Sequence, residues 1–301
     1  MISSVDAATS QFLSGLNQIQ QRAERAQRQL TTGLRINTVS DDPNQIASLI
    51  QTQAELARTQ QLDANLGRVK TEVDTAETGL QSAVSLMDRA MTLGSEGESN
   101  TNSAQQRQDI AGELGSVLQQ LVSISQTSVE GRYIFSGDSD QQTPYTIDLT
   151  QTNPISAYAG SAATRQIELP DGSLVSVSKT AQDIFDSPDA TQNVFQAVNN
   201  LRTALLNNDQ AGIDAALPNV QSAGAFLNAQ LAFYGTVQNR IASGQSYGSS
   251  YETSLTAQIS GIRDADATEA ITDLVQAQTQ EQAALTSRAK LPTTSLFDYL
   301  A

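Results

Sequence analysis

Residues 66–90 read LGRVKTEVDTAETGLQSAVSLMDRA, and apolar side chains recur along them at alternating intervals of three and four. The apolar positions are Leu66, Val69, Val73, Ala76, Leu80, Ala83, Met87 and Ala90. This spacing places all eight on one stripe of an α-helix, and a heptad pattern of this length indicates a coiled coil. Extended over residues 43–93, the helix would form a rod of roughly 75 Å.

Helical patterns continue on both sides of this stretch. An amino-terminal helix is predicted from an apolar stripe that ends before Gly33 and comprises Phe12, Leu16, Ile19, Ala23, Ala26 and Leu30. A polar turn is predicted at residues 94–103, and the helix that follows over 110–124 should return antiparallel to the rod. Further helices are expected over 189–208, 209–243 and 251–290, with the glycines and serines of 244–250 loosening the chain between the last two.

A short segment in the middle of the chain has a different composition. Proline and glycine exclude long helices across 137–180. Alternating apolar residues flank the turn-forming sequence Pro170-Asp171-Gly172-Ser173, which predicts a β-hairpin. The expected fold is therefore mainly α, with a long antiparallel helical rod or coiled coil built from the N- and C-terminal segments and a small β-rich insert. The predicted divisions are an N-terminal assembly arm (1–42), the rod halves (43–136 and 186–254), the insert (137–185) and a C-terminal assembly arm (255–301).

The composition excludes several kinds of chemistry. The 301 residues contain no Cys and no His, which removes disulfides, thiolate nucleophiles, His-dependent triads and the usual zinc sites. The 32 acidic side chains outnumber 17 basic ones, and this balance disfavours nucleic acid as a partner. No apolar run is long enough to span a membrane, and the amino terminus lacks the features of a cleaved signal peptide. We expect no cofactor and no metal.

The acidic pairs in the sequence have structural interpretations. Asp41 and Asp42 precede Pro43, a combination that predicts a helix cap rather than a catalytic pair. Asp138 and Asp140 lie in a GDSD segment without the Glu that an EF-hand requires, so loop geometry is the better explanation. Two polar residues of the last helix, Asp266 and Gln278, are interpreted as seam positions that tune helix register. No catalytic site is predicted.

The two ends of the chain carry complementary features. The amino-terminal arm combines its apolar stripe, in which Phe12, Leu16, Ile19 and Leu30 are the larger members, with a net positive stretch of Arg22, Arg25, Arg28 and Arg35 against Asp6 and Glu24. The carboxyl-terminal arm is net negative, and its apolar residues include Ile259, Ile262, Ile271, Leu274 and Leu285. We predict that the arms pair with each other and with neighbouring copies. Because their seams are thin, the arms should be disordered in a monomer and fold on assembly.

Several short motifs resemble the flagellin family, in order along the whole chain. They are TGLRIN at 32–37, SDDP at 40–43, GRYIFSG at 131–137, DIFD at 183–186, IRDAD at 262–266, QAQ at 276–278 and SLF at 295–297. GRYIFSG and SDDP are similar to the hook-associated members of that family rather than to flagellins themselves. The residues that carry this part of the resemblance are Asp41, Asp42, Pro43, Gly131, Arg132, Tyr133, Phe135 and Gly137.

The resemblance implies a structural role outside the cell, at the junction between the hook and the filament of the bacterial flagellum. It implies four kinds of partner: further copies of the chain in a ring, another hook-associated protein, flagellin, and an export chaperone at the C-terminal end. Export would proceed without a cleaved signal peptide. The alternatives are a short flagellin and two less favoured classes. An acidic surface adhesin would not need helical arms at both ends, and a glycan-cleaving enzyme would need a pair of carboxylates that the sequence does not single out.

Overall fold

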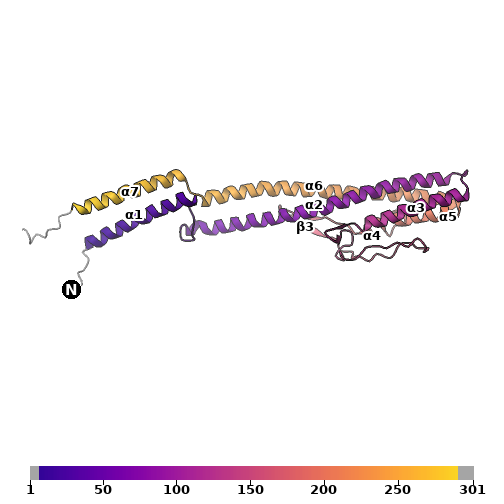
Figure 1. Ribbon diagram of the computed structural model, residues 1–301, viewed down its shortest axis with the longest axis horizontal. Coiled ribbons are helices and arrows are strands. Elements are labelled where there is room, and N and C mark those ends of the chain that lie inside the picture. The colour runs from indigo at the N-terminus through magenta and orange to yellow at the C-terminus, as the bar shows by residue number, and fades with distance from the viewer. Residues whose placement is uncertain (1–6, 291–301) are drawn as a thin grey trace, which may run out of the picture. The chain divides into compact units, whose positions relative to one another are not determined.

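The computed structural model describes residues 7–290, which form two compact units (Figure 1). One unit contains residues 59–250, and the other combines 1–58 with 251–301. The helices are α1 (Ala7–Thr32), α2 (Pro43–Glu98), α3 (Ala104–Ser125), α4 (Ala181–Phe185), α5 (Val194–Leu206), α6 (Gln210–Arg263) and α7 (Ala267–Ala289). The SLF motif at 295–297 and the outermost parts of both predicted arms lie outside the described residues.

Long helices pack side by side in the 59–250 unit. Helices α2 and α6 are antiparallel. At one level Gln238 Nε2 donates to Asp74 Oδ1 at 2.9 Å, and further along α2 Gly94 lies against Leu217. Helix α3 is antiparallel to α2 as well, with Arg89 Nη2 2.6 Å from Glu113 Oε2. All eight seam residues of 66–90 are at most 8% exposed. The predicted coiled-coil stripe and the antiparallel rod are confirmed.

Helix α2 does not end at Gly94, and the turn predicted at 94–103 was placed too early. The helix continues to Glu98, and α3 begins after Ser103, which forms a capping box with Gln106. Gly94 is buried, and a Cβ on it would lie 2.5 Å from a Leu217 methyl and 2.8 Å from a Leu201 methyl. The glycine therefore permits close approach of α5 and α6 rather than breaking the helix.

The predicted break at 244–250 is also absent, because α6 is continuous from Gln210 to Arg263. A Cβ on Gly244 would lie 3.0 Å from Leu169 Cδ2, and one on Gly248 would lie 3.2 Å from Pro170 Cγ. These glycines make room for the hairpin turn to pack on the helix. The real interruption comes after Arg263, and helix α5 is shorter than predicted because Asn193 caps it at its start.

Two small antiparallel sheets lie between α3 and α4, in a β-rich insert that begins ahead of the predicted residue 137. In the first, β1 (Ser128–Val129) pairs with β2 (Arg132–Tyr133), and in the second, β3 (Gln166–Glu168) pairs with β4 (Leu174–Ser176). The second sheet confirms the predicted hairpin, with Ile167 opposite Val175. Aromatic contacts hold the insert on α6: Phe135 is fully buried, and its ring centroid lies 6.4 Å from that of Tyr234 in an edge-on contact.

The buried seam gives a stability test. Leu80 is 0% exposed, and Leu80→Ala should lower the free energy of unfolding by about 2–5 kcal/mol because it removes buried methyl groups and leaves a cavity. The melting temperature of the purified chain should fall by roughly 5 °C or more. The matched control is Leu174→Ala in β4, where the side chain is 67% exposed. Equal melting temperatures for the two variants would contradict the buried seam.

Candidate assembly site formed by the terminal arms

Helices α1 and α7 lie side by side and antiparallel, so the two ends of the chain form one helical pair (Figure 1). Near the free ends of the pair, Arg288 Nη2 donates to Thr9 Oγ1 at 2.8 Å and the guanidinium lies 5.7 Å from the centroid of the Phe12 ring. Further along, Gln20 Nε2 donates to Glu281 Oε1 at 3.1 Å. The predicted pairing of the two arms within one chain is present.

The seam of this pair is thin. On α1, the predicted residues Phe12, Leu16, Ile19 and Leu30 are half-buried, and Ala26 is the one residue of the stripe that is fully buried. On α7, Leu274 is half-buried, while Ala270 and Ala277 are 1% and 2% exposed. Because alanine occupies the most buried positions, the helices approach closely but bury little apolar surface.

Other predicted assembly residues lie elsewhere in the unit. Ile271 and Leu285 are about half exposed, at 52% and 49%, and Val275 accompanies them at 56%. Ile259 and Ile262 are not in the α1–α7 seam but belong to a separate small core. The other members of that core are Ile36 and three residues of α2, namely Ile46, Leu49 and Leu56.

A clasp joins residues 33–36 to residues 263–265 where α1 and α7 meet the rest of their unit. The backbone N–H of Arg35 donates to the Arg263 carbonyl at 2.6 Å, and that of Ala265 donates to the Gly33 carbonyl at 2.9 Å. The Arg35 guanidinium donates to the Ile262 carbonyl at 2.5 Å and to Asp42 Oδ2 at 2.9 Å. TGLRIN, the nearby SDDP and the distant IRDAD therefore converge on one arginine.

Arg35 was not predicted as a site residue. In the sequence it stands out only as a member of TGLRIN and as one of the positive charges of the arm. The available signal was an arginine two residues after the helix-ending Gly33, whose φ of 71° is left-handed. An arginine there can satisfy carbonyl groups that the end of a helix leaves free, but the sequence does not say that those carbonyls belong to α6.

The carboxylates around the clasp hold its turns. Asp41 Oδ2 accepts from the backbone N–H groups of Thr38 at 2.7 Å and Asn37 at 2.9 Å, and the Thr38 bond is the main cause that lowers the pKa of Asp41. Asp42 Oδ1 accepts from the N–H of Gln45 at 3.3 Å, next to Pro43, the first residue of α2. Asp42 thus caps α2 as predicted, whereas Asp41 holds the turn that precedes the helix.

The interpretation of Asp266 as a seam residue was wrong, since it is the N-cap of α7. Its Oδ1 accepts from the N–H groups of Thr268 at 2.7 Å and Glu269 at 3.3 Å, and these bonds lower its pKa. Gln278 is exposed rather than in the seam, because Ala277 occupies the inward position of that turn. A hydrogen bond from Ser260 lowers the pKa of Asp264.

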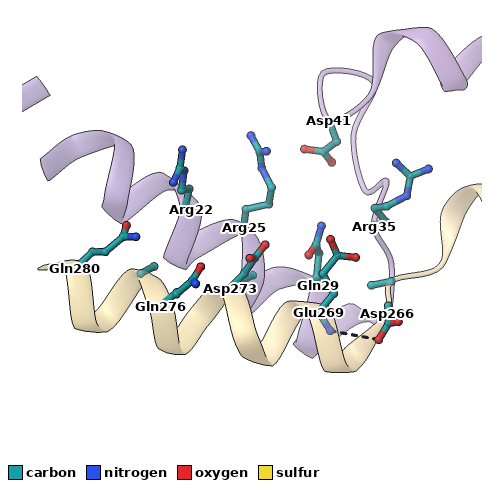
Figure 2. Close-up of a pocket in the computed structure, with 13 residues that line it drawn as sticks. Arg22, Arg25, Gln29, Arg35, Asp41, Asp266, Glu269, Asp273, Gln276 and Gln280 are labelled. Carbon is teal, nitrogen blue, oxygen red and sulfur yellow. Dashed lines mark hydrogen bonds between the residues drawn. The ribbon is translucent and has the colours of Figure 1, made fainter. Parts of the chain in front are cut away.

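A polar groove of about 370 Å³ runs along the arm pair (Figure 2). Figure 2 shows Arg22 and Arg25 on α1 and Glu269 and Asp273 on α7. Ala26 and Ala277 also line it, and both are 2% exposed. The groove contains charges of both signs and little apolar surface, which suits a charged partner surface better than an apolar small molecule.

The GRYIFSG motif belongs to the other unit and has a different role. Gly131 and Gly137 adopt φ values of 77° and 61°, which favour glycine. Arg132 Nη2 lies 3.3 Å from Glu72 Oε1 on α2, and Glu72 also pairs with Arg165 at the start of the hairpin. Together with the buried ring of Phe135, these ion pairs hold the insert on the long helices.

The remaining motif residues complete this loop. The backbone N–H of Tyr133 donates to the Asp140 carbonyl at 2.8 Å, and the Tyr133 side chain is half-buried. The Asp140 carboxylate lies 3.9 Å from Arg132. The two acids of GDSD thus belong to a structured loop, and within residues 7–290 no three Asp or Glu side chains are grouped so that they could bind a metal ion.

Comparisons with known proteins agree with this architecture. The family of bacterial flagellin N-terminal helical regions matches residues 4–140, and that of bacterial flagellin C-terminal helical regions matches residues 213–300. The chain belongs to the flagellin family. Within that family it resembles flagellar hook-associated protein 3 of Escherichia coli, with 25% identity over 324 residues that cover 95% of this chain and 96% of the relative.

Solved structures support the same fold. A putative flagellar hook-associated protein from Vibrio parahaemolyticus gives a TM-score of 0.66 at 20% identity, covering 74% of this chain and 100% of that one. Flagellar hook-associated protein 3 from Legionella pneumophila gives 0.63 at 13% identity, covering 70% and 98%. The chain is thus a structural component of the bacterial flagellum that assembles with other flagellar components, and its family is not enzymatic. Among the described helices, none has the length and apolar character of a membrane span.

The clasp gives a second test. Arg35→Gln should weaken the arm pair by about 1–2 kcal/mol, because a neutral amide replaces two charge-assisted hydrogen bonds. Backbone amides of α1 and α7 should then exchange hydrogen faster, while those of α3 and α5 in the other unit keep their rates. The matched control is Arg28→Gln, an exposed arginine whose ion pair with Glu24 spans 4.0 Å. Unchanged exchange in α1 and α7 of Arg35→Gln would contradict the clasp.

The lowered pKa values of three carboxylates predict how the stability of the arm pair depends on pH. The pKa values of Asp41, Asp264 and Asp266 are lowered in the folded chain. Their contribution to the stability of the folded arm pair is therefore present above the unfolded pKa of about 3.9. It is lost as the pH falls through the pKa values of the folded chain. Hydrogen-exchange protection of α1 and α7, corrected for intrinsic rates, should be constant from about pH 7 to 5 and decline below about pH 4. Asp41→Asn should reduce that decline, and an unaltered profile in this variant would refute the assignment.

Proposed function

We propose that the chain forms the junction between the hook and the filament of the flagellum, and that it joins its neighbours through the arm pair. The observation that carries this proposal is the pairing of the two chain ends in one helical unit that leaves Ile271, Val275 and Leu285 about half exposed on α7. Three large apolar side chains exposed on one helix are a surface that a neighbouring subunit would cover. The resemblance to hook-associated protein 3 over nearly the whole chain supports the same role.

The partners follow from this position. The chain would form a ring with further copies of itself, with another hook-associated protein on the hook side and flagellin on the filament side. It would act outside the cell after export without a cleaved signal peptide, and a chaperone would bind its C-terminal end during export. The exposed apolar residues of α7 support the binding of a chaperone, because an exposed apolar face has to be shielded from water and from unspecific contacts before assembly.

The predicted divisions acquire roles in this proposal. Residues 1–42 and 255–301 serve as assembly arms, 43–136 and 186–254 as the rod, and 137–185 as the insert. The alanine-rich seam of the arm pair supports the further proposal that the arms gain their full helical order on assembly, because burial within one chain offsets little of the entropy cost of ordering them.

A short flagellin is the second candidate, since both matched families describe flagellin helices. The two roles differ in what a deletion strain releases. Loss of a junction protein should leave complete hooks and abundant unpolymerised flagellin in the medium. Loss of the filament subunit should leave hooks with their junction proteins and no flagellin in the medium.

Leu274→Asp tests the role of the arms. Leu274 is half-buried on α7, so a carboxylate there should separate the paired helices while leaving the 59–250 unit folded. Cells that carry the variant should secrete flagellin into the medium, have few filaments by electron microscopy and swim poorly. Leu174→Asp on the exposed strand β4 is the matched control and should leave motility intact. Normal filaments with Leu274→Asp at parental protein levels would refute the proposal.

A further inference from the structure

A pocket of about 300 Å³ lies in the 59–250 unit, between residues 153–157 of the insert and the first half of α5. Main-chain hydrogen bonds fix the insert wall of this pocket. The backbone N–H of Ser156 donates to the Thr146 carbonyl at 3.0 Å, and the carbonyl of Pro154 accepts a similar bond from the strand-like segment opposite it. The wall is therefore held in place by bonds that leave its side chains free to contact a ligand.

Three carboxamide side chains border this pocket without a partner. Asn153 belongs to the insert wall, and Gln196 and Asn199 belong to α5. Within residues 7–290 these three side chains make no hydrogen bond, and Oδ1 of Asn199 is buried as well. A buried amide oxygen without a donor is uncommon in folded proteins and calls for an explanation. Rotation about the Cβ–Cγ bond of Asn199 can present this oxygen to the pocket, and it breaks no hydrogen bond of that side chain.

The composition of the lining excludes several classes of ligand. None of the described residues that line the pocket is basic, so nothing there would neutralise an anion. Asp186 is the one carboxylate of the lining, and both of its oxygens already accept hydrogen bonds, Oδ1 from Asn193 Nδ2 at 2.8 Å and Oδ2 from the Tyr145 hydroxyl at 3.0 Å. A divalent cation would therefore find too few oxygen ligands. A wholly apolar molecule would leave the three carboxamides unpaired.

We propose that this pocket binds a sugar ring, which gives the insert a binding role that goes beyond the junction and does not depend on it. A sugar hydroxyl both donates and accepts, so it can satisfy the carbonyl of one carboxamide and the NH₂ of another. Pro154, Ile155 and Phe195 supply an apolar surface for the C–H face of the ring. The volume is at the lower end of small-molecule sites, which suits one ring better than a peptide segment.

Saturation-transfer NMR on the purified full-length chain tests this proposal. The probes are the methyl glycosides of glucose, galactose, mannose and N-acetylglucosamine, with inorganic phosphate and triglycine as comparison molecules. At least one glycoside should receive saturation from the protein, whereas phosphate and triglycine should not. Saturating amounts of that glycoside should slow amide hydrogen exchange in residues 153–157 and in the first half of α5, and should leave the exchange of α7 unchanged.

Two variants place the sugar at the unpaired carboxamides. Asn199→Leu and Gln196→Ala should each weaken binding of the glycoside by at least about tenfold, because each removes a donor and an acceptor from the pocket. Gln196 is exposed, so its variant keeps the fold and remains informative if Asn199→Leu disturbs α5. The matched control is Asn228→Leu, an exposed asparagine on α6 of the same unit, which should bind the glycoside like the parent chain.

An array of immobilised oligosaccharides distinguishes the two sources of such a ring. Binding to the array as well as to the glycosides assigns the pocket to the ends of glycan chains, and binding to the glycosides alone assigns it to free sugars. Three results would each overturn the proposal: no glycoside binds at its highest soluble concentration, both pocket variants bind the glycoside like the parent chain, or triglycine protects residues 153–157 and the glycosides do not.

Discussion

Closure of the chain between residues 33–36 and 263–265 is the constraint on which the arm unit depends. Its main-chain hydrogen bonds are few, and the Arg35 side chain reinforces them by reaching a carbonyl of α6 and the carboxylate of Asp42. Without closure, α1 and α7 would be single amphipathic helices with little to bury, and most helical stability in proteins comes from packing of an amphipathic face. With it, each arm finds the apolar stripe of the other in antiparallel register, and the polar groove exists only as a result of that register.

The other unit is stabilised in a different way. Its long helices share an uninterrupted apolar seam with Leu66, Leu80 and Leu93 among its fully buried members, and glycines at 94 and 244 admit neighbouring side chains where larger residues would clash. The insert is fixed on these helices by the Phe135 ring and by Glu72, which pairs with two arginines. The two units thus differ in physical terms. One has a well-filled core, and the other has thin alanine seams, an exposed apolar face and a groove bordered by exposed charges, the features of a surface built for partners.

Most of the helical architecture was predictable from the sequence, because apolar periodicity reports which face of a helix is buried regardless of what buries it. Local causes explain four features: the apolar stripe of 66–90, the end of α1 before Gly33, the helix cap at Asp42 and Pro43, and the hairpin around Gly172. The errors concerned glycines and two polar residues of the last helix, Asp266 and Gln278. Gly94 and Gly244 were interpreted as breakers because local propensity disfavours glycine in helices, but close packing of neighbouring elements outweighs that preference. Asp266 was placed in a seam because no proline or glycine follows Arg263 to mark the interruption, and the nearby Gly261 lies inside α6.

The sequence by itself determined the helix stripes, the small β insert, the absence of thiol and imidazole chemistry, and the resemblance to the flagellin family, since each of these depends on residue types and on spacing along the chain. Only the tertiary structure decided that TGLRIN, SDDP and IRDAD meet at Arg35, that Leu274 is half-buried while Ile271 and Leu285 stay exposed, and that arginines of one helix border the same groove as carboxylates of another. The contacts of Arg35 and Gln20 join residues more than 200 positions apart. Local periodicity fixes the face of each helix but not its partner or register, which are set by packing between segments that the sequence keeps far apart.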